Sequence, residues 1–140
     1  MFVLDTNVLT TLMSHHPPPE VVGWLDRQPD ELLFTTSISQ AEILAGLAVM
    51  PEGRRRRGLE EAAMAIFLED FDGRVLPFDG ESTAAYARMF AARRRIGRPA
   101  ATFDLMIGAI AKSYGASVVT RDTGGFEGYN LSLINPWIAS

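Results

Sequence analysis

The sequence predicts an α/β fold, a three-layer α/β/α sandwich with a mainly parallel central sheet. Short apolar runs alternate with longer stretches of helical periodicity along the 140 residues. The short runs are continuously apolar, which is typical of parallel strands covered on both faces. A hydrophobic content of 47% allows a substantial core, and the length suits one domain, so we expect a single domain over residues 1–140.

Five short apolar segments are expected to form the strands. The first ends at an acid, Asp5, and the fourth has another acid, Asp122, just beyond it. The last is expected at an edge of the sheet. The five segments are residues 1–4, 32–38, 74–78, 117–120 and 131–134.

Six segments have the spacing or the flanking residues of helices. Ser39 and Glu42 match the S-x-x-E capping box at the start of the third, and Asp79 and Thr102 are expected to cap the last two. The arginine-rich stretch 51–58 is expected to be a turn between helices. The six helices are predicted at residues 6–13, 19–27, 39–50, 58–73, 80–92 and 103–114.

The composition excludes several classes of protein. The chain has no cysteine, which excludes disulfides and thiolate metal sites and favours a reducing cytosol. Its N-terminus lacks a basic region, and no apolar run approaches the roughly 20 residues that span a bilayer. We therefore expect a cytoplasmic protein with no membrane partner.

The positive charge is almost entirely arginine and is unevenly distributed. The formal net charge is −4, from 13 Lys and Arg against 17 Asp and Glu. Two runs, Arg54–Arg57 and Arg93–Arg95 with Arg98 close behind, contain much of the positive charge. Arginine binds phosphates well, but such runs also occur on solvated helix faces. At this point both interpretations stay open, with Arg94 and Arg98 the candidates for contact with a nucleic acid.

Four acids are expected at the edge of the sheet where parallel strands end. Asp5 and Asp122 follow predicted strands, and Glu42 and Asp104 are expected in the first turns of helices. Each alone has a structural explanation as a cap or a turn residue. Together they would form a crowd of carboxylates that repel one another, which raised pKa values or a bound cation can relieve.

An oxygen-only set of ligands suits a hard cation, Mg²⁺ or its substitute Mn²⁺. Such a cation polarises a phosphoryl oxygen and generates hydroxide from bound water, which is the chemistry of phosphodiester hydrolysis. The adjacent His15 and His16 lie beside three prolines and are expected to be exposed loop residues.

Several motifs then occur in a consistent order along the chain. They are LDTNVL at 4–9, SISQAEI at 37–43 followed by LAGLAV, DLMIGAIA at 104–111, VVTRD at 118–122, VLPFD at 75–79 and NPW at 135–137. In these features the chain resembles PIN-domain ribonucleases, and more closely the VapC/FitB-like toxins of type II toxin–antitoxin modules. The resemblance covers essentially the whole chain.

The resemblance implies a PIN-like fold, Mg²⁺-dependent endoribonuclease activity on RNA, homodimerisation and inhibition by a cognate antitoxin. It implies that the four acids are catalytic and metal-binding, since they match the acidic positions of the family. Thr120 matches a hydroxyl position beside the site and is expected to be catalytic as well, and Thr6 and Asn7 complete the first motif. Thr6, Asn7, Arg94 and Arg98 are accordingly the expected substrate-binding residues.

Other enzyme and signalling classes fit the motifs less well. A haloacid-dehalogenase-like phosphatase needs D-x-D, and position 7 here is Asn. A receiver domain needs an acid pair and a lysine that are absent. The alternative left open is a catalytically silent PIN-fold binding subunit of a repressor complex. For a partner helix, the expected groove lies between helices 6–13 and 39–50, with residues Val8, Leu9, Leu12, Ile43, Leu44 and Leu47.

Overall fold

The computed structural model describes residues 1–138 and contains a five-stranded, fully parallel sheet. The strand order is β3-β2-β1-β4-β5, so the first strand of the chain lies at the centre. The predicted parallel sheet is confirmed, and the expectation of one domain over residues 1–140 stays a prediction. The strands are β1 (Phe2–Leu4), β2 (Leu33–Thr36), β3 (Val75–Leu76), β4 (Ser117–Val119) and β5 (Leu133–Ile134).

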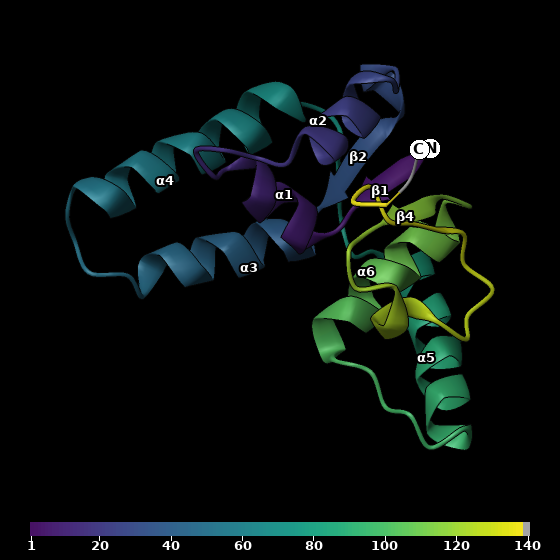
Figure 1. The fold of residues 1–140 in the computed structure, drawn as a ribbon. Coiled ribbons are helices and arrows are strands. Elements are labelled where there is room, and N and C mark those ends of the chain that lie inside the picture. The colour runs from purple at the N-terminus through teal and green to yellow at the C-terminus, as the bar shows by residue number, and fades with distance from the viewer. Residues whose placement is uncertain (139–140) are drawn as a thin grey trace.

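Helices cover both faces of this sheet, as Figure 1 shows. A π-helical turn, Ala65–Asp70, extends the fourth helix, and short 3₁₀ turns occupy Asp30–Leu32 and Thr123–Phe126. The helices are α1 (Thr6–Leu12), α2 (Pro19–Asp26), α3 (Ser37–Ala48), α4 (Arg54–Met64), α5 (Gly80–Arg95) and α6 (Thr102–Ser113). Within residues 1–138 we find no helix with the length and apolarity needed to cross a membrane.

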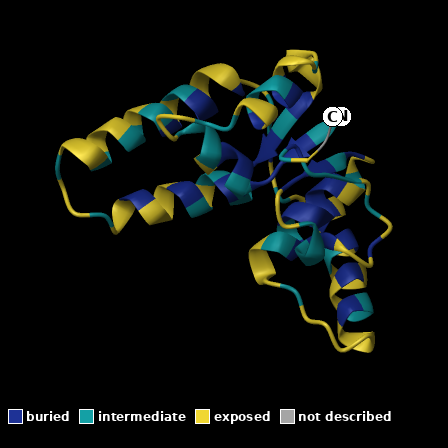
Figure 2. Ribbon diagram, viewed as in Figure 1, coloured by how far each residue is buried: buried dark blue, intermediate teal, exposed yellow. Residues whose placement is uncertain are grey.

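The strands send alternate side chains into two separate cores. Leu4, Leu33 and Val119 pack with side chains of α1 to α4, whereas Val3 and Val118 pack with those of α6 on the other face. In Figure 2 the dark-blue buried residues lie at the sheet and on the helix faces turned toward it. A third cluster joins α5 to α6. The three-layer α/β/α sandwich is therefore confirmed.

Helix α3 begins two residues before the predicted start, and the predicted capping box at Ser39 is wrong. Thr36 is the N-cap: its backbone is extended and its side chain accepts a hydrogen bond from the Ser39 amide. Thr36 also pairs with Leu76 of β3, so it is both the last residue of β2 and the cap of α3. As a consequence Glu42 lies in the second turn of α3 rather than the first, and its side chain is free to reach the sheet edge.

The arginine-rich stretch expected as a turn is instead the start of α4. Helix α4 begins at Arg54, directly after Gly53. Arg56 forms an ion pair of 3.3 Å with Glu60 one turn later and donates to the Met50 carbonyl oxygen. Through Arg56 the start of α4 is thus hydrogen-bonded to the connection from α3. The run Arg54–Arg57 lies at one end of the molecule (Figure 1).

Two other helix boundaries differ in ways that affect the site. Helix α5 continues to Arg95 rather than stopping at Ala92, so the second arginine run forms its last turn. Helix α6 starts at Thr102, with Ala101 as N-cap and no side-chain cap, so Thr102 is not the predicted cap. Asp79 caps α5 as predicted, accepting a hydrogen bond from the Ser82 amide.

Candidate active site

The order in which strands are added to the sheet reverses at β1. From β1 the chain proceeds to β2 and β3 on one side and then crosses to β4 and β5 on the other. In open parallel sheets a ligand crevice forms at the carboxyl ends of the two strands between which the order reverses, here β1 and β4. Asp5 directly follows β1, and Thr120 and Asp122 follow β4.

Asp5 is buried, with 4% of its surface exposed, and its carboxylate has three donors. As N-cap of α1 it accepts the Thr6 amide at 2.8 Å on Oδ1. Its Oδ2 accepts the Thr120 hydroxyl at 2.8 Å and the Asn7 amide nitrogen at 3.3 Å. These bonds hold the carboxylate in one orientation at the end of the central strand.

Thr120 and Asn7 connect the ends of β1 and β4. The Thr120 hydroxyl, fully buried, accepts the Asp122 amide at 3.0 Å and the Asn7 side-chain nitrogen at 3.2 Å. The Asn7 side-chain oxygen accepts the Arg121 amide at 3.2 Å. Asp122 is thereby tied through its backbone to Asp5, although 116 residues separate them.

Glu42 reaches the same edge from α3 and is held by Thr6. Its Oε1 accepts the Thr6 hydroxyl at 2.7 Å, and the buried Ser39 hydroxyl lies 2.9 Å from that of Thr6. Sequence reasoning missed this role of Ser39 because it assigned Ser39 to the helix cap. The polar atoms of Thr6 and Asn7 thus bind the acids of the site. Their expected contact with substrate stays a prediction.

The carboxylates of Asp104 and Asp122 both approach Gly125. A Cβ at Gly125 would lie 2.9 Å from Oδ2 of Asp104 and 3.3 Å from Oδ2 of Asp122. Asp104 occupies the first turn of α6, as predicted. After Asp122 the residues Thr123–Phe126 form a 3₁₀ turn, in which Phe126 is 1% exposed. The close approach of Gly125 is a second feature that the sequence reasoning missed, and the paired glycines were its signal.

Burial, and then the neighbouring carboxylates, raise the pKa of Asp5, Glu42 and Asp104. Burial and the charges of Asp5, Asp122 and Glu42 raise the pKa of Asp104 from 3.8 to about 6. Burial, and to a lesser extent Asp122, raises the pKa of Asp5, although the Thr120 and Thr6 hydrogen bonds act against this. Burial and then Asp5 raise the pKa of Glu42, with Thr6 opposing. The four acids predicted from the sequence therefore form one electrostatically coupled cluster.

The family profile of the PIN domain matches residues 2–130. The chain belongs to the PIN-domain family. This PIN domain is 43% identical over 139 residues to the plasmid stability protein StbB of Pseudomonas syringae pv. tomato, covering 99% of this chain and all of that protein. It is 40% identical over 137 residues to the VapC ribonuclease Y4jK of Sinorhizobium fredii, covering 98% of each.

Solved structures agree with the sequence relatives. The crystal structure of FitAcB from Neisseria gonorrhoeae matches this PIN domain with a TM-score of 0.91 and 35% identity, covering 99% of this chain and 100% of that one. The resemblance to the VapC and FitB proteins inferred from the motifs is therefore confirmed.

The donor set of the PIN-domain site determines which cation it could hold. Within residues 1–138 no three acidic or histidine side chains lie close enough to surround one cation directly. Mg²⁺, however, commonly binds through one or two carboxylates and keeps several of its waters. The carboxylates of Asp104 and Asp122 both lie close to Gly125 and offer oxygen ligands only. The residues present fit a largely hydrated Mg²⁺ or Mn²⁺.

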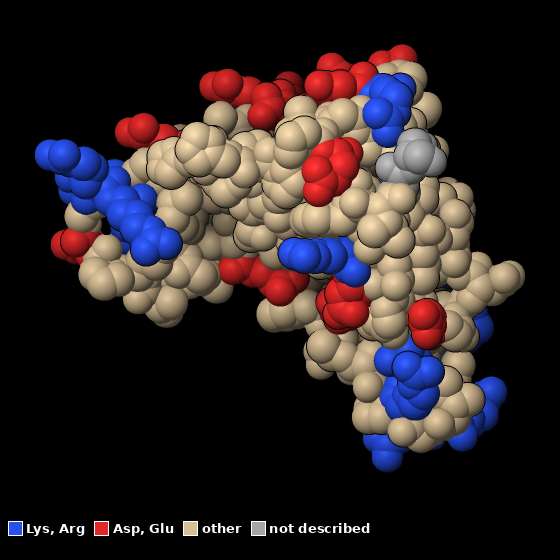
Figure 3. All heavy atoms as spheres, in the orientation of Figure 1, with Lys and Arg blue, Asp and Glu red and all other residues tan. Residues whose placement is uncertain are grey.

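The arginines predicted near the site separate into two kinds. Arg94 and Arg98 are exposed, and the Arg94 guanidinium lies 5.6 Å from the centre of the Phe90 ring. Arg93, grouped with them from the sequence as flanking the cleft, is 6% exposed and donates to backbone carbonyls. In Figure 3 red carboxylate atoms lie in the angle between α3 and α6, with blue cationic side chains on both sides.

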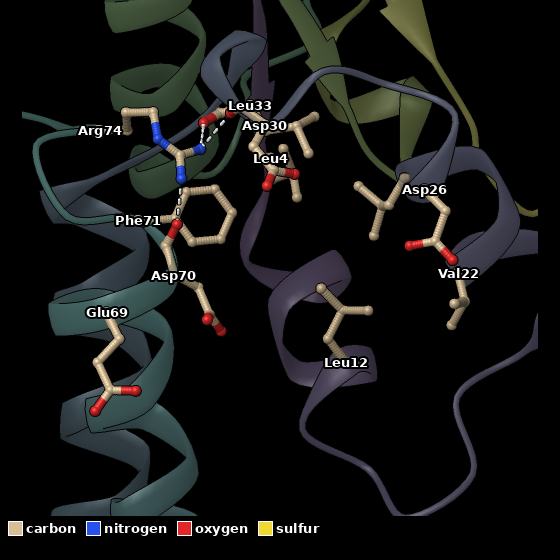
Figure 4. Close-up of a pocket in the computed structure, with 11 residues that line it drawn as sticks. Leu4, Leu12, Val22, Asp26, Asp30, Leu33, Glu69, Asp70, Phe71 and Arg74 are labelled. Carbon is tan, nitrogen blue, oxygen red and sulfur yellow. Dashed lines mark hydrogen bonds between the residues drawn. The ribbon is translucent and has the colours of Figure 1, made fainter.

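The cavity drawn in Figure 4 lies apart from this cluster. It has a volume of about 540 Å³ and is bordered by α1, α2 and the π-helical turn, and none of the four acids lines it. Arg74 donates to the carbonyl oxygens of Asp30, Leu33 and Asp70 there. These bonds join β3 to the chain before β2, and we assign the cavity no catalytic role.

Proposed function

We propose that this PIN domain is a metal-dependent endoribonuclease that hydrolyses RNA phosphodiester bonds. The observation that carries the proposal is the convergence of four acids, from four separate elements, into one cluster. In this cluster burial and the charges of Asp5, Asp122 and Glu42 raise the pKa of Asp104 to about 6. A cluster of this kind is stabilised by a cation. The VapC ribonuclease among the relatives supports RNA as the substrate.

Asp104 and Asp122, whose carboxylates both lie close to Gly125, are the residues proposed to hold Mg²⁺ most directly. Asp5 and Glu42 complete the negative charge around it, and Mn²⁺ is the expected substitute. When bound, the ion would polarise a phosphoryl oxygen and lower the pKa of a water molecule. Thr120 keeps the Asp5 carboxylate in place by donating to it.

The substrate is proposed to approach along the arginines beside the cluster. Arg94 and Arg98 are exposed at the end of α5 and in the loop that precedes Asp104. Their guanidinium groups are free to neutralise RNA phosphates, and Arg94 over Phe90 offers a flat surface to a base. Thr6 and Asn7 are proposed to contribute at the edge of the cluster.

We further propose that the chain is the toxin of a toxin–antitoxin pair and acts as a homodimer. The FitAcB structure supports a protein partner. A cavity of about 450 Å³ between α1, α3 and α4 is a candidate seat, with Ile43, Leu47 and Leu59 among its lining. Val8 and Leu9, expected in that groove, are fully buried in the core and are excluded from it.

The second candidate function is a catalytically silent subunit of a repressor complex. It is favoured by one structural relative, a FitAB complex bound to an IR36 DNA fragment. The retained acids favour catalysis, since a purely structural subunit has no need of a carboxylate cluster that destabilises its own fold.

The test is cleavage of single-stranded RNA by the purified chain in Mg²⁺, in excess EDTA, and after Mn²⁺ is added back. We expect cleavage with either ion and none in the chelator. Asp104→Asn prepared in parallel controls for contaminating ribonuclease. Cleavage that persists in EDTA, or that is equal for the variant, would overturn the mechanism; a well-folded chain with no cleavage in either metal would favour the silent subunit.

A further inference from the structure

Arg93 differs from the other arginines of its run because it faces inward. Arg93 is 6% exposed, whereas Arg94 and Arg95 are both exposed. Within residues 1–138, Asp5 and Arg93 are the only charged residues that are buried. A buried charge is costly unless its surroundings compensate it, so both of these residues require an explanation.

The guanidinium of Arg93 binds backbone carbonyls of two loops. Its Nε donates to the Arg98 oxygen at 2.5 Å, and its Nη1 donates to the Glu127 oxygen at 2.8 Å and the Gly124 oxygen at 3.4 Å. Its Cζ also lies 5.5 Å from the centre of the Tyr129 ring. One side chain thereby joins the last turn of α5, the loop before α6 and the turn after β4.

No carboxylate in the described chain lies within ion-pair distance of Arg93, so these bonds do not belong to a salt bridge. The Arg93 charge nevertheless acts on the acid cluster, where it opposes the rise in the pKa of Asp104. Arg93 is therefore a buried cation whose Nε and Nη1 donate to loop backbone and not to a carboxylate.

The loop that Arg93 binds is the one that sets the distance between two of the acids. The turn Thr123–Phe126 follows Asp122, and within it Gly125 packs against the Asp104 carboxylate. Gly124 and Glu127, whose carbonyls Arg93 holds, lie on either side of the Gly125–Phe126 pair. A shift of this turn would move Asp122 relative to Asp104.

We propose that Arg93 is a positioning residue of the nuclease. It holds the turn after β4 against the start of α6 and so sets Asp122 opposite Asp104, while Arg94 and Arg98 remain available to RNA. This inference rests on the proposed ribonuclease function for its kinetic part. Its structural part, the order of the 123–128 segment, is independent of that function.

The test compares Arg93→Gln, Arg93→Lys and the exposed neighbour Arg94→Gln in steady-state RNA cleavage and in amide hydrogen exchange. For Arg93→Gln we expect kcat to fall about 10- to 100-fold, as for other groups that orient metal ligands, with KM for RNA unchanged. Exchange of the amides of residues 123–128 should accelerate. Arg93→Lys should recover only part of the parent's kcat and only part of its slow exchange at 123–128. An ammonium lacks the planar fork that reaches several carbonyls.

Arg94→Gln is the matched control, since it removes the same charge one residue away without touching the turn. We expect it to raise KM while kcat and exchange stay as in the parent. An Arg93→Gln variant that behaves like this control would make Arg93 an RNA contact and overturn the proposal. So would a variant that melts earlier yet retains its kcat and its exchange pattern at 123–128.

If Arg93→Gln fails to fold, the same measurements of kcat, KM and exchange at 123–128 are made on Arg93→Lys. A parent chain that never cleaves RNA would defeat the proposed function alone. Faster exchange at 123–128 would then still support Arg93 as the residue that orders the turn, and unchanged exchange would still refute it.

Discussion

The hydroxyl of Thr120, at the end of β4, donates a 2.8 Å hydrogen bond to the carboxylate of Asp5, at the end of β1. The same oxygen accepts the Asp122 amide at 3.0 Å. One buried hydroxyl thus connects two acids of the cluster and two neighbouring strands. A side chain of the same shape without the hydroxyl would break both connections at once.

Thr120→Val should therefore cost both stability and activity. It leaves the Asp122 amide without its acceptor and Asp5 Oδ2 with only the longer bond from Asn7, and we expect the free energy of unfolding to fall by about 2 kcal/mol. Cleavage should fall about tenfold or more, because Asp5 loses a donor that orients it. Thr120→Ser, which keeps the hydroxyl, should retain most of its activity. Urea unfolding and cleavage rates measure the two effects, and equal activity of the two variants would remove Thr120 from the site.

Asp104→Asn should separate catalysis from folding. Deleting this charge relieves repulsion within the cluster, so in metal-free buffer at neutral pH the variant should be as stable as the parent or slightly more so. Its RNA cleavage should drop about a hundredfold or more, since a group proposed to hold the metal is removed.

Glu81→Gln is the control for Asp104→Asn, because Glu81 also lies in the first turn of a helix, α5, but is exposed. It should melt slightly below the parent and cleave normally. Thermal unfolding and RNA cleavage compare the pair. An Asp104→Asn variant that melts several degrees lower and still cleaves would make Asp104 a helix-terminus acid only.

The stability of the metal-free protein should depend on pH through Asp104. Its pKa is raised from 3.8 to about 6, so the folded state holds this proton more tightly than the unfolded state does. The parent should therefore gain stability relative to Asp104→Asn as pH falls from about 6 to about 4, by about 1 kcal/mol after allowance for solvent screening. Above about pH 6 Asp104 is ionised in the folded protein, and the full cost of this half-buried charge lowers the stability of the parent. Urea unfolding of both proteins across the window tests this, and parallel curves would contradict it.

Arg94→Ala combined with Arg98→Ala should flatten the salt dependence of RNA binding. Each phosphate that the protein no longer neutralises lowers the slope of log K against log salt by about 0.7 for a single strand. Binding is measured with the Asp104→Asn variant so that the RNA stays intact. Arg54→Ala with Arg57→Ala, two exposed arginines of α4, is the charge-matched control and should leave the slope unchanged. Equal slopes for both double variants would show that Arg94 and Arg98 are solvent-exposed side chains that do not contact RNA phosphates.

The position of the acids at the sheet edge was predictable from local patterns. A buried strand followed by an acid, as at Leu4 and Asp5, needs no information from the rest of the chain. The start of α3 was not predictable to the residue, because both Thr36 and Ser39 are good caps. Pairing of Thr36 with Leu76 of β3 decides between them, and that contact lies 40 residues away.

The separate role of Arg93 was hidden for the same kind of reason. Arg93, Arg94 and Arg95 are identical in sequence terms, and a run of three is typical of one solvated face. Only the direction of each side chain on α5, set by how α5 packs on α6, turns Arg93 toward the Gly124 and Glu127 carbonyls. Contacts between distant backbone atoms leave no pattern in the sequence.

The central place of β1 in the sheet has a consequence for the protein during its synthesis. Translation delivers β1 first, yet its neighbour β4 emerges only after β2, β3 and all six helices. Until then Asp5 lacks its bond to Thr120, and Asp122 has not been made. A nascent chain therefore holds three of the four acids in an unassembled state. Under the proposed ribonuclease function, the site is thus completed only after residues 120–122 have been made, late in the reading of the message.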